Sequence, residues 1–331
     1  MTYLRLLFAP YTLALLAVVG AATLFPASGE AALALEHITY VAVALLFFFH
    51  GAKLSREAIT AGASHWRLHL LVFACTFILF PLVGRVMKPA LVPLLGGPLY
   101  IGLLYLCALP GTVQSAIAFT SLARGNVAAA VCSASASSLI GIVLTPLLLN
   151  LLIGTHGDGP HLGEAIVSIG TQLLLPFLAG HLLRPWIGAW IQRHRARLGY
   201  LDQGSILLVV YAAFSHSVTG GLWHSISLVE LAMLLAVCTA LLALIVTVTT
   251  RLARTAGFDT ADEITIVFCG SKKSLATGVP MAQVLFGAQA IGPVLLPLML
   301  FHQIQLMACT MLAQRYAMRR EERHAENLKA V

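Results

Sequence analysis

The segment GSKKS, Gly270 to Ser274, places two adjacent lysines inside a long apolar stretch. The chain is uncharged from Ile264 to Ser271, and again between Lys273 and Arg315. A lysine at the centre of a membrane helix costs at least about 2.5–3.5 kcal/mol, so two of them need a purpose. The pair therefore indicates a membrane span that contains a site.

The composition of the whole chain is that of an integral membrane protein. Of its 331 residues, 59% are hydrophobic and 10% are charged, whereas soluble domains are about one-quarter charged. Uncharged stretches are long enough to cross a bilayer core of about 30 Å. We predict an all-α membrane protein, a single transporter domain over residues 1–331 with ten spanning helices. The expected spans are 8–25, 33–52, 68–87, 98–122, 127–152, 165–189, 202–222, 228–250, 262–287 and 291–313.

The distribution of basic residues predicts the orientation. With the N-terminus in the cytoplasm, 16 of the 20 lysines and arginines fall in cytoplasmic segments, and only Arg85 and Lys88 fall in outer loops. This predicts a multi-pass plasma-membrane protein with both termini cytoplasmic and a basic cytoplasmic tail over 314–331. The net charge of +7 is then a matter of topology. We expect the lipid bilayer as the surroundings and no nucleic-acid partner.

The six cysteines lie in apolar stretches without metal-ligand spacing, so neither a metal site nor a cofactor is expected. Nucleotide-binding, zinc-protease and nucleophile-elbow motifs are also absent from the sequence, so we do not expect an enzyme. The sequence does not determine the oligomeric state.

Two halves are visible in the pattern of spans. The acidic loop 154–164 separates five spans in about 8–152 from five in about 165–313, and because five is odd, similar halves would be inverted. Spans four and nine hold corresponding places, and both are interrupted. Interrupted helices at matched positions are typical of transporter binding sites. The predicted break residues are Pro110, Gly111, Gly270, Gly278 and Pro280.

The half-helices that follow the breaks begin near mid-depth, where their positive N-terminal ends could face an anion. The lysines either handle substrate or ions, or donate to carbonyls of the broken helices. If they handle substrate, their alanine variants should fold but lose activity. Membrane serines, histidines and glutamines also have a purely structural use between helices. The candidate binding residues are Thr112, Gln114, Ser115, Ser133, Ser137, Gly270, Ser271, Lys272, Lys273, Ser274, His302 and Gln303.

Acidic residues are not expected at mid-depth. Asp202, Asp262 and Glu263 are predicted at cytoplasmic ends of spans, and Glu230 at an outer end. A carboxylate partner for the two lysines is therefore not predicted.

Three segments resemble a known family. FCGSKKSLATGVPMA (Phe268 to Ala282), LPGTVQSA (Leu109 to Ala116) and LARGNVA (Leu122 to Ala128) are similar to the double-lysine branch of the bile acid:sodium symporter superfamily. The resemblance implies two inverted five-helix repeats in a bacterial inner membrane. It also implies a panel of spans one, two, six and seven. The remaining spans would form a core in which four and nine cross at unwound centres.

The coupling ion is left open by the same resemblance. In sodium-coupled members it implies an acidic ligand two residues before the crossover glycine, which aligns here with Phe268. Two hydroxyl positions align with Ala130 and Ala134, and a glutamine of the sodium site aligns with Lys272. Sodium or a proton is possible, since lysine protonation could replace or supplement sodium.

The expected function is secondary active transport of a small organic anion by alternating access. The alternative is a membrane regulator of ion homeostasis that retains the transporter fold without transporting.

Overall fold

The computed structural model describes residues 10–54, 64–153, 162–221 and 226–329, and these residues form helices and no strand. Residues 8–9 of the first expected span and most of the acidic loop lie outside the described residues. The helices, in chain order, are α2 (Pro10–Leu24), α3 (Gly29–Lys53), α5 (Trp66–Ala74), η1 (Cys75–Leu79), α6 (Phe80–Val86), α7 (Lys88–Ala108), α8 (Gln114–Leu122), α9 (Val127–Ile153), α10 (Leu162–Ile169), η2 (Gly170–Leu174), α11 (Leu175–Arg193), α12 (Arg195–Thr219), α14 (Leu228–Thr255), α15 (Thr260–Gly270) and α16 (Leu275–Lys329).

Seven helical stretches among the described residues are long and apolar enough to cross a membrane. The chain is therefore a multi-pass membrane protein. Three expected spans are not among the seven: α2 has only 15 residues, the sixth is made of α10, η2 and α11, and the ninth is divided between α15 and α16. The count of ten spans stays a prediction.

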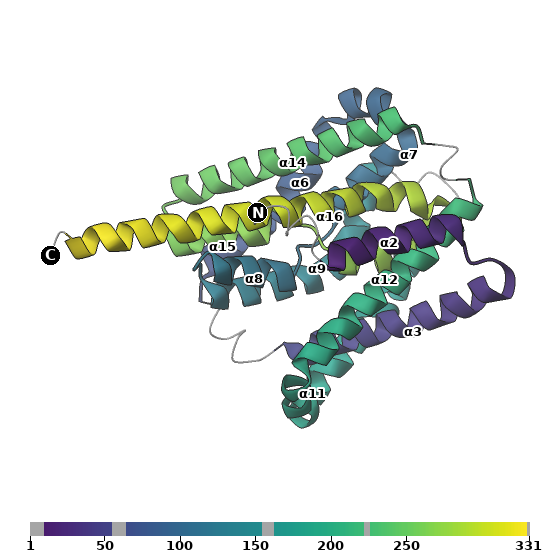
Figure 1. Ribbon diagram of the computed structural model, residues 1–331, viewed down its shortest axis with the longest axis horizontal. Coiled ribbons are helices and arrows are strands. Elements are labelled where there is room, and N and C mark those ends of the chain that lie inside the picture. The colour runs from purple at the N-terminus through teal and green to yellow at the C-terminus, as the bar shows by residue number, and fades with distance from the viewer. Residues whose placement is uncertain (1–9, 55–63, 154–161, 222–225, 330–331) are drawn as a thin grey trace.

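The helix α16 contains a reversal of the chain. Its bounds are Leu275 and Lys329, yet a Cβ at Gly278 would lie 2.6 Å from the Leu298 side chain. In a straight helix these positions would be about 30 Å apart. The chain therefore turns back between them, as expected for two antiparallel spans. Beyond this turn, α16 continues through the predicted basic tail to Lys329 (Figure 1).

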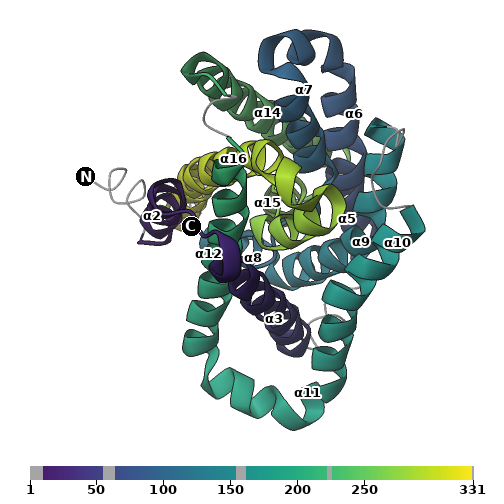
Figure 2. The same cartoon turned by 90° about the vertical axis from the view of Figure 1, so that its right-hand side faces the viewer.

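The helices other than α10 and η2 form two groups. The first, which we call the α3 layer, consists of α2, α3, α11 and α12: α3 packs on α11 and α12, and α12 packs on α2. The second, the crossing bundle, consists of α5 to α9 with η1 and α14 to α16. Figure 2 shows α3, α11 and α12 on one side of α15, with α6, α7 and α14 on the other. The helix α12 joins the groups by packing against α16.

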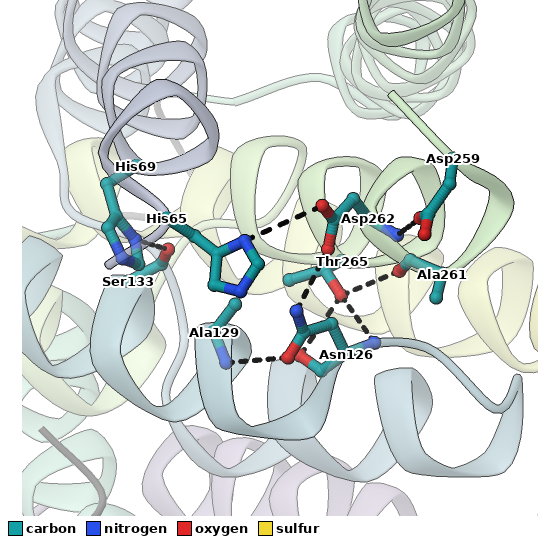
Figure 3. Close-up of polar contacts among 9 residues, drawn as sticks. All are labelled: His65, His69, Asn126, Ala129, Ser133, Asp259, Ala261, Asp262 and Thr265. Atoms are coloured by element: carbon teal, nitrogen blue, oxygen red, sulfur yellow. Dashed lines mark hydrogen bonds and ion pairs between the residues drawn. The ribbon is translucent and has the colours of Figure 1, made fainter. Parts of the chain in front are cut away.

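A clamp around Asn126 fixes α9 to α15 (Figure 3). The Asn126 side-chain Nδ2 donates to Asp262 Oδ1 (2.9 Å), and its main-chain N–H donates to Thr265 Oγ1 (2.9 Å). Its Oδ1 accepts from the N–H of Ala129 in the first turn of α9 (3.0 Å), as a helix cap does. The start of α9, which directly follows the interrupted fourth span, is thus tied to the half of the ninth span that lies toward the predicted cytoplasmic face.

Within the α3 layer, two glycines allow α3 and α11 to touch backbone to backbone. A Cβ at Gly180 would lie 1.9 Å from the carbonyl oxygen of Phe48, and a Cβ at Gly51 would lie 1.9 Å from that of Phe177. Neither contact can be relieved by rotating a side chain, because both partners are main-chain atoms.

We predict that Gly180→Ala destabilises the protein by about 3 kcal/mol or more, since overpacking of this kind forces the two helices apart. Thermal unfolding of the purified protein in detergent measures the effect. The matched control is Gly204→Ala in α12, whose Cβ would meet nothing within 4 Å. Equal unfolding temperatures for the two variants would contradict the backbone contact.

Candidate substrate-binding site

The two interrupted spans touch at their breaks. The first break lies between α7, which ends at Ala108, and α8; the second lies between α15 and α16. The N–H of Ser274 donates to the carbonyl oxygen of Pro110 (3.0 Å). A Cβ at Gly111 would lie 3.0 Å from the carbonyl oxygen of Cys269. The predicted break residues Pro110, Gly111 and Gly270 therefore lie at a close crossing of main chains.

The prediction that Gly278 and Pro280 contribute to the break was wrong. The helix α16 begins at Leu275 and contains both residues. Gly278 serves packing instead, because a Cβ there would lie 2.6 Å from side-chain atoms of Leu109 and Leu298. Pro280 lies in the second turn of α16, where the helix accommodates it. The break thus ends four residues before Gly278.

Lys273 satisfies three main-chain carbonyls at the crossing. Its Nζ donates to the oxygens of Thr76 (2.8 Å), Cys107 (2.8 Å) and Leu109 (2.7 Å). Cys107 lies in the last turn of α7, where carbonyls lack intrahelical partners. In the π-helical register of η1, the Thr76 carbonyl would pair with the N–H of residue 81, and Pro81 has none. Lys273 is 0% exposed, so all three of its donors are used inside the protein.

The first break is also held by side chains of α9. Thr145 Oγ1 donates to the carbonyl oxygen of Ala108 (2.9 Å). The hydroxyl oxygen of Ser137 accepts from the N–H of Gly111 (3.1 Å). Because both partners are main-chain groups that the break leaves free, Ser137 supports the break itself.

The second break is held by Gln305 of α16. Its Oε1 accepts from the main-chain N–H of Lys273 (2.9 Å), and its Nε2 donates to the carbonyl oxygen of the same residue (2.9 Å). Ser271 closes the end of α15, since its hydroxyl donates to the carbonyl oxygen of Val267 (2.6 Å). The amide of Gln303, which was the predicted neighbour of the site, is buried without a hydrogen-bond partner among the described residues.

Lys272 is held differently from Lys273. Its Nζ donates to the carbonyl oxygen of Ser115 (3.0 Å). It also lies 3.7 Å from the ring centroid of Phe119 and 5.3 Å from that of Phe268. An ammonium above aromatic faces is attracted by about 2 kcal/mol or more when desolvated. The ammonium group of Lys272 and the rings of Phe119 and Phe268 therefore lie together.

A cavity of about 210 Å³ lies between the α3 layer and the crossing bundle, with lining residues from α3, α8, α9, α11, α12 and α16. Both half-helices that follow the breaks begin at its wall. Of the candidate residues, the cavity is lined by Thr112, Gln114, Ser115, Ser274 and His302. The candidates that do not line it are Ser133, Ser137, Gly270, Ser271, Lys272, Lys273 and Gln303.

The helix ends give the cavity its polarity. The first N–H groups of a helix have no intrahelical partner and carry its positive dipole end. Ser274 caps α16, because its Oγ accepts from the N–H of Thr277 (3.2 Å). Ser133 lies away from the cavity, 2.6 Å from Nδ1 of His69 (Figure 3). The N-terminal ends of α8 and α16, and not Lys272 or Lys273, therefore line the cavity with positive polarity.

Two residues of this region were not among the candidates chosen from the sequence. Asp202 is 2% exposed and lines the cavity, although it was predicted at a span end without a role in the site. Gln305 holds the second break, whereas Gln303 was favoured. A carboxylate within an apolar span could have pointed to Asp202, but the depth of Asp202 depends on how α12 packs.

The comparisons with known proteins agree with the resemblance seen in the sequence. Residues 9–318 match the model of the SBF-like CPA transporter family. The chain belongs to this family. An uncharacterized protein of Pseudomonas aeruginosa is 62% identical over 94% of each chain. A protein of Escherichia coli named "Putative symporter YfeH" is 56% identical over 96% of this chain and 95% of its own. The sodium/bile acid cotransporter 7 of Rattus norvegicus is 30% identical over 87% and 86%.

Membership of the SBF-like CPA transporter family confirms the bile acid:sodium symporter resemblance and the prediction that the chain is not an enzyme. It makes the chain a member of a transporter family. The names of the relatives favour transport over the regulator alternative.

The contacts of the two lysines predict different stabilities for their variants. In Lys273→Met three buried carbonyls lose their donor, and each costs about 1–3 kcal/mol when left unpaired. In Lys272→Met only the Ser115 carbonyl does. We therefore expect Lys273→Met to lower the unfolding temperature of the purified protein far more than Lys272→Met. An equal or smaller loss in Lys273→Met would show that these carbonyls do not depend on Lys273. The earlier expectation that lysine variants fold normally is thus revised for Lys273.

Proposed function

We propose that this protein is a secondary active transporter, a symporter that carries a small organic anion by alternating access. The observation that carries the proposal is that the N-termini of α8 and α16 both line one cavity, between the α3 layer and the crossing bundle. Two converging positive helix ends favour an anion. The apolar side chains of Leu46, Phe47 and Phe177, which line the same cavity from the α3 layer, suit an organic ligand.

The proposed architecture is the one implied by the sequence. Ten spans form two inverted repeats, about 8–152 and 165–313, with spans four and nine crossed at their breaks. The α3 layer acts as the panel, and the crossing bundle acts as the core. We place the protein in a bacterial inner membrane, with both termini in the cytoplasm.

Alternating access is supported by a second cavity on the same interface. It measures about 240 Å³ and is lined by Ala32 and Leu35 of α3 and by His216 of α12. The first cavity is lined by the other end of α3, at Leu54, and the other end of α12, at Asp202. Two cavities at opposite ends of one interface are what a rocking panel and core require.

The coupling ion is proposed to bind outside the sodium site of the sodium-coupled relatives. Phe268 and Lys272 stand where that site would have a carboxylate and a glutamine. A hard cation prefers several oxygen ligands, which an ammonium group beside two aromatic rings does not provide. A proton or a sodium ion bound elsewhere would drive transport.

Blocking the cavity should abolish binding without disturbing the fold. Ala276 lies in the first turn of α16 and lines the cavity, so Ala276→Trp fills it. Thermal-shift screening would use taurocholate and short-chain carboxylates, with sodium or choline, between about pH 5 and 8. We expect at least one anion to stabilise the wild type, and at least tenfold weaker stabilisation and liposome uptake in Ala276→Trp.

The matched control is Leu235→Trp on α14, where the leucine is 47% exposed. This variant should bind and transport as the wild type does. If no anion stabilises the wild type, or if Ala276→Trp transports at the normal rate, the proposed site is wrong.

A further inference from the structure

The cavity contains one carboxylate whose hydrogen bonding is incomplete. Asp202 Oδ2 accepts from Lys53 Nζ (2.5 Å) and from Gln114 Nε2 (2.9 Å). Its Oδ1 is buried and has no hydrogen-bond partner among the described residues. The residue is 2% exposed and lines the cavity. A buried acceptor without a donor is expensive, so a ligand donor that reaches Oδ1 through a small movement of the Asp202 side chain would be favoured.

Asp202 also determines which way Gln114 points. An ionised carboxylate only accepts hydrogen bonds, so Gln114 must direct its Nε2 toward Asp202. Its Oε1 is then turned away from the carboxylate. Because Gln114 is exposed and lines the cavity, this oxygen is available to a ligand. The wall therefore presents Gln114 Oε1 directly, and Asp202 Oδ1 becomes a second acceptor after a small movement of its side chain.

The charge of this wall does not exclude an anion. The ammonium of Lys53 lies against Asp202, and the Lys53 side chain is 24% exposed, so the pair is close to neutral. Main-chain donors at the start of α16, after the cap at Ser274, supply the opposite polarity. The cavity thus combines a donor region with an acceptor region, and apolar side chains such as Phe47 complete it.

The other buried carboxylate at this face lacks such a vacancy. Glu263 Oε2 accepts from Arg254 Nε (2.9 Å), and Oε1 accepts from Arg254 Nη2 (2.9 Å) and from the Tyr316 hydroxyl (2.8 Å). It joins α14, α15 and α16 and does not line the cavity. Both of its oxygens are used structurally, whereas Asp202 has one left for a ligand.

We propose that Asp202 and the Gln114 that it orients select an organic anion that also carries a hydrogen-bond donor, a hydroxyl or an ammonium group. The inference rests on the proposed function and specifies its substrate class. The anionic group binds at the helix N-termini, and the donor binds Asp202 Oδ1 or Gln114 Oε1. An anion without a donor leaves a buried acceptor unpaired, which weakens binding by about tenfold or more.

The test compares carboxylates with and without the donor; in L-alanine the ammonium donor also cancels the net charge. Lactate and L-alanine are each compared with propionate, and 3-hydroxybutyrate with butyrate, by the concentration that gives half-maximal thermal stabilisation of the purified protein. We expect this concentration to be at least about tenfold lower for the members that bear a donor. Lactate and alanine distinguish a hydroxyl from an ammonium as the preferred donor.

Variants assign the preference to particular groups. In Asp202→Asn the new amide can donate to Gln114 Oε1 and turn Nε2 toward the ligand, so the preference for a donor should disappear. Gln114→Met removes one acceptor and one hydrogen bond to Asp202 Oδ2 but keeps the ion pair of Lys53 with Asp202, and it should reduce the preference even if Asp202→Asn folds poorly. The matched control is Asp259→Asn, a helix cap of α15 outside the cavity. It should keep the full preference, because asparagine caps as well as aspartate.

The outcomes separate the two proposals. Equal stabilisation by the members with and without a donor would overturn the selection and leave anion transport standing. A full preference retained in both Asp202→Asn and Gln114→Met would overturn the roles given to these residues. If no anion of either kind stabilises the wild type, the proposed function fails together with the inference.

Discussion

The ammonium group of Lys273 is the contact on which the site depends. Helices can be interrupted within a membrane only if the freed main-chain groups find partners. At this crossing Lys273 donates hydrogen bonds to the carbonyl oxygens of Thr76, Cys107 and Leu109 at the same time. One lysine thus satisfies the end of α7 and the π-helical turn of η1. Without it, three buried carbonyls would face one another.

This arrangement divides the four helix ends at the crossing by charge. The carbonyl end of α7 is occupied by a fixed cation that belongs to the protein, and the carbonyl end of α15 is closed by the hydroxyl of Ser271. The N-terminal ends of α8 and α16 line the cavity instead. A built-in ammonium serves the carbonyl side of the crossing. The anion-attracting ends are left for the ligand, which accounts for an anion site whose lysines do not line it.

Much of the crossing could be predicted from the sequence. A charged pair in an apolar stretch and a matched Pro-Gly interruption identify segments that must meet protein partners, and this reasoning located Gly111 and Gly270. Residues just after the breaks, such as Gln114 and Ser115, could be predicted to line the site, because the N-terminal end of a helix carries its positive dipole end. The prediction of ten spans in two inverted halves has the same basis. Among the described residues, seven helical stretches are long and apolar enough to span a membrane.

The remaining features depend on packing that periodicity does not encode. Gln303 and Gln305 lie on the same helix, and the rotation of α16 about its axis decides which of them reaches the break. Asp202 lies near the start of α12, and its burial follows from the contact of α12 with α3. Gly278 resembles a break residue in the sequence, but its lack of a side chain makes room for leucines.

The central claim is that an anion binds at the helix N-termini and not at the lysines. The most direct measurement is the anomalous diffraction of crystals soaked in bromide. We predict a bromide peak in the cavity, between the first turns of α8 and α16 near Ser115 and Thr277. A peak against the ammonium of Lys272 or Lys273, with none in the cavity, would contradict the account.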